Sequence, residues 1–310
     1  MRIDEAIAHD GQPSFSFEFF PPKTPEGERN LGAALSELSA LEPTFVSVTY
    51  GAGGSVEQKH ATVEIVSHVK ERYGLEAMAH FTCVGATVDE LRAMLDRIAA
   101  AGIDNVLALR GDPPRGEVEW KATEGGLSYS RELIELIRDE YGFSIGAACF
   151  PETHIHASSP EADLAYLKEK VDAGARFLVT QLFFDNDVYW SFVARAREIG
   201  IDVPIIPGIM PITNGDQVRR FTEMCGATIP ADLLQQIELR ADDSPEAVAE
   251  LGVAYATLQC TDLLAKGAPG IHFYTLNKSP ATRAILSALK AARPWQRAPA
   301  SAPAAANQSA

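Results

Sequence analysis

The chain has 310 residues, of which 46% are hydrophobic and 22% charged, and it carries a formal net charge of −15. This size and composition predict a soluble globular protein with either one large α/β domain or two small ones. The strong negative charge argues against nucleic acids and anionic membranes as partners, because such a field repels polyanions.

The first residues, MRIDEAIAHDGQP, lack the apolar core of a signal peptide, and no run of about 18 apolar residues occurs in the chain. We therefore expect a cytoplasmic protein without a membrane span. Its cysteines, Cys83, Cys149, Cys225 and Cys260, are widely spaced and contain no C-x-x-C pair. This spacing predicts reduced, mostly buried thiols and neither a zinc knuckle nor a redox pair.

Short β-rich runs alternate along the chain with amphipathic helical patterns. The helical patterns at 88–102, 130–142 and 162–175 place apolar residues at i, i+3, i+4 and i+7. Two or three further helices, at roughly 215–226, 230–241 and 244–266, precede the last run. The predicted strands are residues 14–20, 44–50, 76–83, 104–110, 144–150, 176–184, 203–209 and 270–276.

This repeat predicts a single (β/α)8 barrel domain over residues 13–290, with extra helices before the last strand. A doubly wound sheet would have fewer strands and a nucleotide-binding fingerprint, and in YGAGGSV the third glycine of that fingerprint is replaced by Val56. Residues 1–12 form an N-terminal extension in this interpretation. Residues 291–310, rich in Pro, Ala and Ser, are predicted to be a disordered tail.

The stretch FSFEFFPPKTP, residues 15–25, places the carboxylate of Glu18 among phenylalanines at the end of the first predicted strand. Alternation along a strand puts Phe17 and Phe19 on one face and Ser16 and Glu18 on the other. Either Glu18 belongs to a functional site, or it lies on an edge strand and faces water. These residues alone leave both interpretations open.

Polar residues recur at the carboxyl ends of the predicted strands, which is where barrel enzymes place their active sites. Their shared location at one rim predicts a functional site, although each residue alone has a structural explanation. They are Glu18, Thr49, His80, Thr82, Arg110, Asp112, Glu152, His154, Gln181, His272 and Tyr274.

Three short motifs allow other interpretations. His154 and His156 have metal-binding spacing, and with Glu152 they would suit a metal-dependent hydrolase or lyase, but no clear further ligand set accompanies them. GAGGS, residues 51–55, is either a phosphate cradle or a flexible turn. RGD, residues 110–112, closes an apolar strand and is not expected to act in adhesion.

Seven motifs, in this order, resemble the bacterial methylenetetrahydrofolate reductases: FSFEFFPPKTPEG, SVTYGAGGS, ALRGDPP, ACFPETH, VTQLFFD, PGIMPI and HFYTLN. The resemblance covers residues 12 to about 287. It implies a (β/α)8 flavoprotein that uses FAD and NADH or NADPH to reduce 5,10-methylenetetrahydrofolate to 5-methyltetrahydrofolate. It also implies ping-pong kinetics, a supply of methyl groups for methionine synthesis and a homo-oligomer. Because no clear ligand set accompanies the histidines, we expect no metal site. A non-catalytic folate- or flavin-binding protein is a further alternative.

The resemblance also implies site residues. The substrate contacts would be Asp112, Gln181, Gln217, Phe221 and Lys278. The FAD contacts would be Thr49, His80, Arg110, Gly111, Asp112, Ser130, Phe150, His154, Asp163 and Lys170. Departures from the family pattern occur at Phe150, where Tyr is common, at Lys278, where Arg is expected, and at Glu169, where some members have Arg near the pyrophosphate.

Two residues, Glu18 and Asp112, have catalytic roles in this interpretation. Glu18 would protonate the leaving nitrogen of the substrate, and desolvation among aromatic rings is expected to raise its pKa towards neutrality. Asp112 would stabilise the cation that develops in the pterin. Gln181 would orient the substrate, and Phe221 would offer an aromatic face for stacking.

Overall fold

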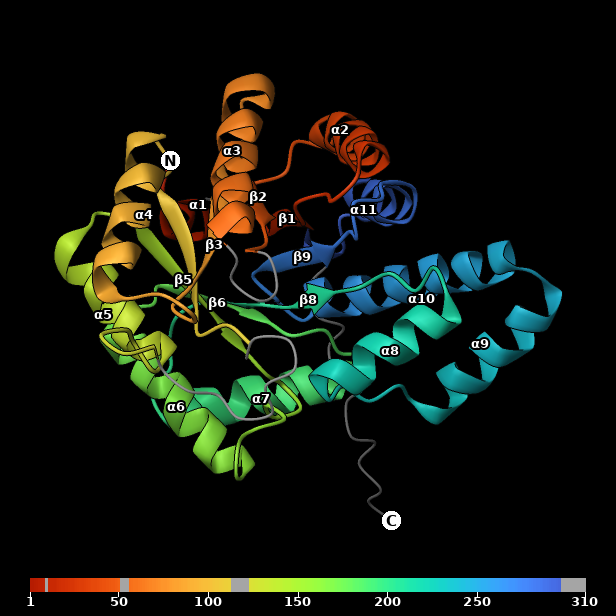
Figure 1. The fold of residues 1–310 in the computed structure, drawn as a ribbon. Helices are drawn as coiled ribbons and strands as arrows, with labels where there is room; N and C mark the ends of the chain where they lie inside the picture. Colours follow the sequence, from red (N-terminus) through yellow and green to blue (C-terminus); the bar gives the residue numbers. More distant parts are fainter. Residues whose placement is uncertain (9–10, 51–55, 113–122, 297–310) are drawn as a thin grey trace, which may run out of the picture.

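The structure is a computed structural model that describes residues 1–8, 11–50, 56–112 and 123–296 (Figure 1). Its centre is a parallel sheet in which β1 to β7 pair in chain order, β1 also pairs with β9, and β9 pairs with β8. The strands are β1 Ser14–Phe19, β2 Phe45–Val48, β3 Ala77–Thr82, β4 Asn105–Leu109, β5 Ser144–Cys149, β6 Phe177–Thr180, β7 Ile205–Ile206, β8 Gly208–Ile209 and β9 Gly270–Tyr274. The predicted (β/α)8 barrel is confirmed.

The seventh predicted strand, 203–209, is divided into β7 and β8 by Pro207. β7 pairs with β6, whereas β8 pairs with β9, so the two pieces lie at opposite ends of the hydrogen-bonded strand order. Proline has no amide hydrogen to donate to a ladder, which explains the break. The barrel is closed at this point by the continuous chain through Pro207.

Helices surround the barrel, and α8, α9 and α10 extend together from one side of it (Figure 1). These three are the extra helices predicted before the last strand. Local capping fixes the helix starts; at α4, for example, Thr87 and Glu90 form a capping box. The helices are α1 Ile3–Ala8, α2 Pro25–Ser39, α3 Val56–Tyr73, α4 Val88–Ala100, α5 Ser130–Glu140, α6 Pro160–Ala173, α7 Asn186–Glu198, α8 Gly215–Cys225, α9 Ala231–Asp243, α10 Pro245–Ala265 and α11 Pro280–Ala292.

The barrel interior is apolar at its amino-terminal end. Phe45, Met78 and Phe177 fill it there, and α1 adds Ile3 and Ile7 to the same cluster. Residues 1–8 of the predicted extension therefore contribute to the barrel core. The buried polar side chains at this end hold α1 in place: Asn105 accepts from the Ile3 amide at 2.8 Å and Ser144 accepts from the Asp4 amide at 3.2 Å.

The chain after α11 continues as a short 3-10 helix, Pro294–Gln296, and the ring of Trp295 lies 5.8 Å from that of Phe15. The predicted disordered tail falls largely on residues 297–310, which lie outside the described residues. All four cysteines are free thiols, and Cys83, Cys149 and Cys260 are buried, as expected. Among the described residues no helix is long and apolar enough to cross a membrane.

Candidate active site

Glu18 projects into the barrel interior near the carboxyl-terminal end and meets two histidines there. Its Oε2 lies 3.4 Å from Nε2 of His272 on β9 and 3.4 Å from Nε2 of His80 on β3. The Glu18 side chain is 19% exposed, whereas those of His80 and His272 are 7% and 1% exposed. Three ionisable groups from three strands thus converge at one point of the rim.

Strand alternation produces this convergence. Phe17 and Phe19 pack into the layer between strands and helices, so Ser16 and Glu18 point inward. On the neighbouring strand Ser16 is in register with His272 and Glu18 with Tyr274. The edge-strand alternative is wrong, because β1 is paired on both sides, with β2 and β9.

The expected upward shift of the Glu18 pKa is not what the structure supports. Burial raises the pKa of this carboxyl, but the hydrogen bond from His272 and the electrostatic interactions with the His80 and His272 imidazoles together hold it below its ordinary value. The phenylalanines that flank Glu18 in sequence point to the other side of the strand. Its actual neighbours are imidazoles, which stabilise the carboxylate.

His80 presents an unsatisfied polar atom at this rim. Its Nε2 and the Oγ1 of Thr82 are buried and have no hydrogen-bond partner within the described part of the chain. Burial also lowers the His80 pKa, which favours the neutral imidazole. A ligand edge that hydrogen-bonds to these two atoms would satisfy them, so the end of β3 fits a cofactor with hydrogen-bonding edges.

Four of the predicted FAD contacts lie together after β5 and on α6. The Phe150 and His154 rings are perpendicular with centroids 4.5 Å apart, and the His154 amide donates to Asp163 at 3.0 Å. Lys170 donates to the Ala148 carbonyl at 2.8 Å, and burial lowers its pKa. This cluster combines an aromatic surface with a cation and an anion.

The remaining predicted FAD contacts follow other strands. Thr49 follows β2, Ser130 begins α5, and Arg110, Gly111 and Asp112 follow β4. Gly111 has φ +91°, and a Cβ there would lie 2.4 Å from Val84. Only glycine fits this backbone position without strain. Asp112 is exposed, as a group that contacts a ligand from the rim would be.

Arg131 is a basic residue that the motifs did not single out. Its Nε lies 3.6 Å from the carboxylate of Glu169, the position where some family members carry arginine. The Arg131–Glu169 pair thus places a guanidinium beside the position at which this chain departs from the family pattern. Its signal in the sequence was weak, because Arg131 follows Ser130 on a different helix from Glu169.

The predicted substrate contacts come from three other segments. Gln181 follows β6 and borders a cavity of about 10 Å³ that Phe150 also lines. Gln181 and Phe150 are therefore neighbours, although they are far apart in sequence. Gln217 and Phe221 lie one helical turn apart on α8, so both occupy the same side of that helix.

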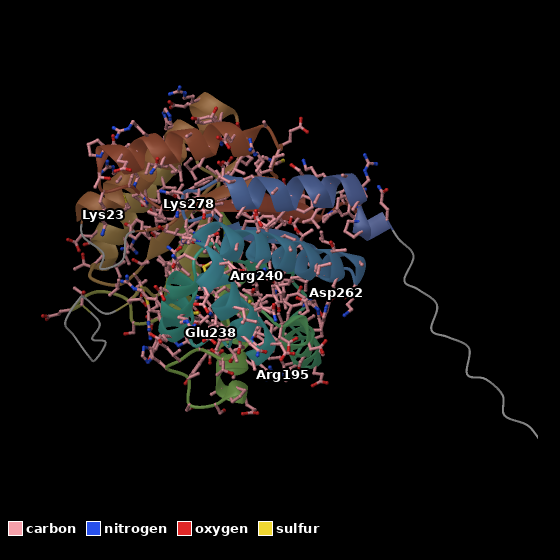
Figure 2. All side chains as sticks on the ribbon, turned by 90° about the vertical axis from the view of Figure 1, so that its right-hand side faces the viewer. Lys23, Arg195, Glu238, Arg240, Asp262 and Lys278 are labelled. Carbon is pink, nitrogen blue, oxygen red and sulfur yellow. The ribbon has the colours of Figure 1, made fainter. Side chains whose placement is uncertain are left out.

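Lys278 lies in the loop after β9 and is exposed at the surface (Figure 2). The preceding residue, Asn277, ties this loop to the one after β1, because its side chain accepts from the Phe20 amide at 3.0 Å and donates to the Phe20 carbonyl at 2.8 Å. Lys23, also exposed, follows Phe20 in the joined loop. The link holds two cation-bearing loops at the rim beside Glu18.

The alternative metal site receives no support from these side chains. Both carboxylate oxygens of Glu152 accept from the Thr228 amide at 3.0 Å, and His154 Nδ1 accepts from the His156 amide at 3.1 Å. Within the ranges that the structure describes, no group of three His, Cys, Asp or Glu side chains could share a metal ion. The GAGGS motif lies outside the described residues.

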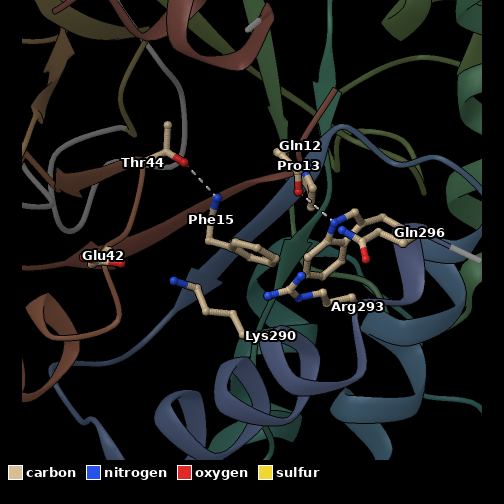
Figure 3. Close-up of a pocket in the computed structure, with 9 residues that line it drawn as sticks. Gln12, Pro13, Phe15, Glu42, Thr44, Lys290, Arg293 and Gln296 are labelled. Carbon is tan, nitrogen blue, oxygen red and sulfur yellow. Dashed lines mark hydrogen bonds between the residues drawn. The ribbon is translucent and has the colours of Figure 1, made fainter. Parts of the chain in front are cut away.

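A cavity of about 470 Å³ lies far from this rim (Figure 3). Phe15 and Thr44, at the starts of β1 and β2, line it together with Lys290, Arg293 and Trp295 from the end of α11 and the following turn. It thus opens at the amino-terminal end of the barrel and contains none of the predicted site residues. Despite its size, we place the candidate active site at the opposite end, where Glu18 lies.

Comparisons with known proteins identify the family of this chain. The family model of methylenetetrahydrofolate reductase matches residues 2–290. The Escherichia coli (strain K12) 5,10-methylenetetrahydrofolate reductase is 41% identical, and the match covers 93% of this chain and 94% of that protein. Methylenetetrahydrofolate reductase (NADH) 1 of Arabidopsis thaliana is 42% identical over 94% of this chain. The chain spans about half of that plant protein, 52% of its length.

Solved structures show the same fold at low identity. A Clostridium thermocellum protein, described as binding two copies of 5-methyl-5,6,7,8-tetrahydrofolic acid, is 15% identical with a TM-score of 0.61, covering 94% of this chain and 99% of that one. The 7,8-dihydropteroate synthase of Vibrio fischeri ES114 is 13% identical with a TM-score of 0.51, covering 93% and 95% of the two chains. The match of the family model over nearly all of the described barrel shows that this chain belongs to the methylenetetrahydrofolate reductase family.

Proposed function

We propose that the chain reduces 5,10-methylenetetrahydrofolate to 5-methyltetrahydrofolate with electrons from NADH or NADPH, using FAD. The observation that carries the proposal is the inward-facing Glu18, held near the carboxyl-terminal rim by two histidines in a chain of this family. The Arabidopsis thaliana and Zea mays relatives are named as NADH enzymes, which favours NADH as the donor. We further propose a homo-oligomeric cytoplasmic enzyme that supplies methyl groups for methionine synthesis.

FAD, when bound, supplies a centre that takes hydride from the nicotinamide and gives it to the folate. The unsatisfied Nε2 of His80 and Oγ1 of Thr82 fit the polar edge of such a cofactor. Three nitrogen-bearing side chains lie near one another at the end of β5: Lys170, Arg110 and His154. Their N–H groups would donate hydrogen bonds to the oxygens of a pyrophosphate. Thr49, Gly111, Asp112, Ser130, Phe150 and Asp163 complete the residues that would hold it.

Glu18 acts as the general acid in this proposal. The bridging carbon of the substrate accepts hydride only after its five-membered ring opens, and opening requires a proton on the leaving nitrogen. The pKa of Glu18 is below its ordinary value in the structure, while its side chain keeps 19% exposure. Substrate bound at the rim would remove that remaining water and, by desolvation, raise the Glu18 pKa so that it holds the proton it delivers.

Other residues of the rim would bind and orient the substrate. Asp112 accepts a hydrogen bond from the pterin and stabilises positive charge there. Gln181, Gln217 and Phe221 position the folate, and Lys278 attracts its terminal carboxylates. Because both substrates would use one site in turn, ping-pong kinetics follow.

The test is the colour and chemistry of the purified protein. We expect a yellow protein whose FAD is released by heat or acid, since the proposed contacts are non-covalent. Rates of flavin bleaching with NADH and NADPH, followed by reoxidation with methylenetetrahydrofolate, measure the donor preference and the activity. FMN, a covalent flavin, or a flavin that folate does not reoxidise would contradict the proposal.

A further inference from the structure

His272 is enclosed in the barrel, and both of its ring nitrogens are engaged. The Phe45 ring stacks on it at 6.0 Å and 19°, and the Tyr274 ring meets it edge-on at 5.4 Å and 90°. Nδ1 lies 2.8 Å from the hydroxyl of Ser16, while Nε2 lies 3.4 Å from Oε2 of Glu18. The imidazole is thus fixed between a buried serine and the carboxylate.

Ser16 determines which nitrogen of His272 carries the proton. If its hydroxyl donates to Nδ1, the neutral ring carries its hydrogen on Nε2 and donates it to the Glu18 carboxylate. The other neutral tautomer would point the Nε2 lone pair at a negative oxygen. The hydrogen-bond network therefore assigns the Nε2–H tautomer while Glu18 is charged.

His80 provides an internal comparison. Its Nε2 is at the same 3.4 Å from Oε2 of Glu18, yet that atom has no hydrogen-bond partner within the described residues. The two imidazoles are therefore not equivalent, because only His272 has the geometry to donate. Both approach Oε2, which leaves Oε1 for a contact from the rim.

We propose, on the basis of the function proposed above, that His272 is the positioning residue that sets the proton affinity of Glu18, and that Ser16 holds it in the required tautomer. When the O–H bond of Glu18 breaks and its proton forms an N–H bond on the leaving nitrogen, the resulting carboxylate accepts from His272 Nε2. His272 itself neither gains nor loses a proton. The titratable groups that face it within the described residues are Glu18 from β1, His80 from β3 and Tyr274 from β9.

The test is an NMR titration of the full-length holoprotein labelled with 13C-glutamate, in which the Glu18 signal is assigned by its loss in Glu18→Gln. A hydrogen bond donated to a charged carboxylate stabilises the charged form and so lowers its pKa. Its loss in His272→Asn is therefore expected to raise the Glu18 pKa by about one to two pH units. Ser16→Ala should raise it by less, and His80→Asn by less than His272→Asn. Ser14→Ala is the matched control, since Ser14 donates to the Pro269 carbonyl instead. An unchanged Glu18 pKa in folded His272→Asn, or in Ser16→Ala if that variant alone folds, would overturn the proposal.

Kinetics separate this inference from the proposed function. In His272→Asn the alkaline limb of flavin reoxidation by folate should move to higher pH by the same amount as the NMR midpoint, because Glu18 keeps its proton longer. Flavin reduction by the nicotinamide should keep its pH profile. A shifted NMR midpoint with an unshifted reoxidation profile would support the coupling of His272 to Glu18 and would refute Glu18 as the acid.

Discussion

Replacing Glu18 with glutamine removes the transferable proton while preserving nearly everything else. The backbone of Glu18 stays anchored by the Thr275 hydroxyl, which donates to its carbonyl at 2.6 Å, and by the pairing of β1 with β2 and β9. The new amide oxygen can still accept from His272 Nε2. We therefore expect the free energy of unfolding to change by no more than about 1 kcal/mol.

The expected kinetic effect falls on one half-reaction. General acid catalysis is typically worth about 100- to 10,000-fold, or about 2.7 to 5.4 kcal/mol of activation free energy. Reoxidation of reduced flavin by methylenetetrahydrofolate should slow by that factor, whereas reduction by the nicotinamide needs no acid at this position. Stopped-flow absorbance of the flavin measures each direction separately.

Glu152→Gln is the matched control, because Glu152 is a rim carboxylate that accepts from the Thr228 amide and has no proposed acid role. Both half-reactions should remain within about threefold of the wild type there. If Glu18→Gln also reoxidised with folate within about threefold of the wild type, Glu18 would not be the acid.

Three further outcomes are expected. Asp112→Asn should retain FAD and slow folate reduction about 10- to 1000-fold, more than it slows flavin reduction by the nicotinamide; equal slowing in stopped-flow would indicate misplaced flavin instead. Gly252→Ala should lower the free energy of unfolding in urea by about 3 kcal/mol, because its Cβ would lie 1.8 Å from the Ile212 carbonyl oxygen, whereas Gly32→Ala, with nothing within 4 Å, should not destabilise. The Glu18 pKa is lowered from 4.5, so its carboxylate stabilises the fold above that pH and loses this effect as the pH falls through the folded pKa. The stability difference between the wild type and Glu18→Gln should therefore shrink on acidification, and a widening difference in acid unfolding would contradict the sign.

Much of the fold was predictable because it depends on local periodicity. Alternation identified the strands and placed Glu18 on the face opposite Phe17 and Phe19, and the 3.6-residue pattern identified the helices before β9. The sequence shows Pro207, but it does not show that the strand divides there, because that depends on the pairing of β7 with β6 and of β8 with β9. The role of α1 was equally hidden, because it depends on which barrel residues its two isoleucines meet.

The chemistry of the site was predictable in residue identity but not in electrostatics. Glu18 was identified from its own segment, yet the group that donates to it, His272, is 254 residues away in the chain. Sequence neighbours suggested an apolar pocket, whereas spatial neighbours supply imidazoles. The pKa of Glu18 is set by the latter, so its direction required the register of β1 against β9.

Because β7 and β8 pair with different strands, the peptide chain through Pro207 is the covalent link that closes the barrel between them. Thr180, at the end of β6, makes two hydrogen bonds to the strands on the other side of this break. Its hydroxyl accepts from the Gly208 amide at 2.9 Å, and its carbonyl accepts from the Tyr274 hydroxyl at 2.6 Å. A circular permutant with new termini at Pro207 would leave only such contacts to hold the ring, and would expose two sheet edges able to pair with other chains. The covalent link at Pro207 thus keeps a barrel whose hydrogen-bond ladder is interrupted between β7 and β8 from behaving as an open, aggregation-prone sheet.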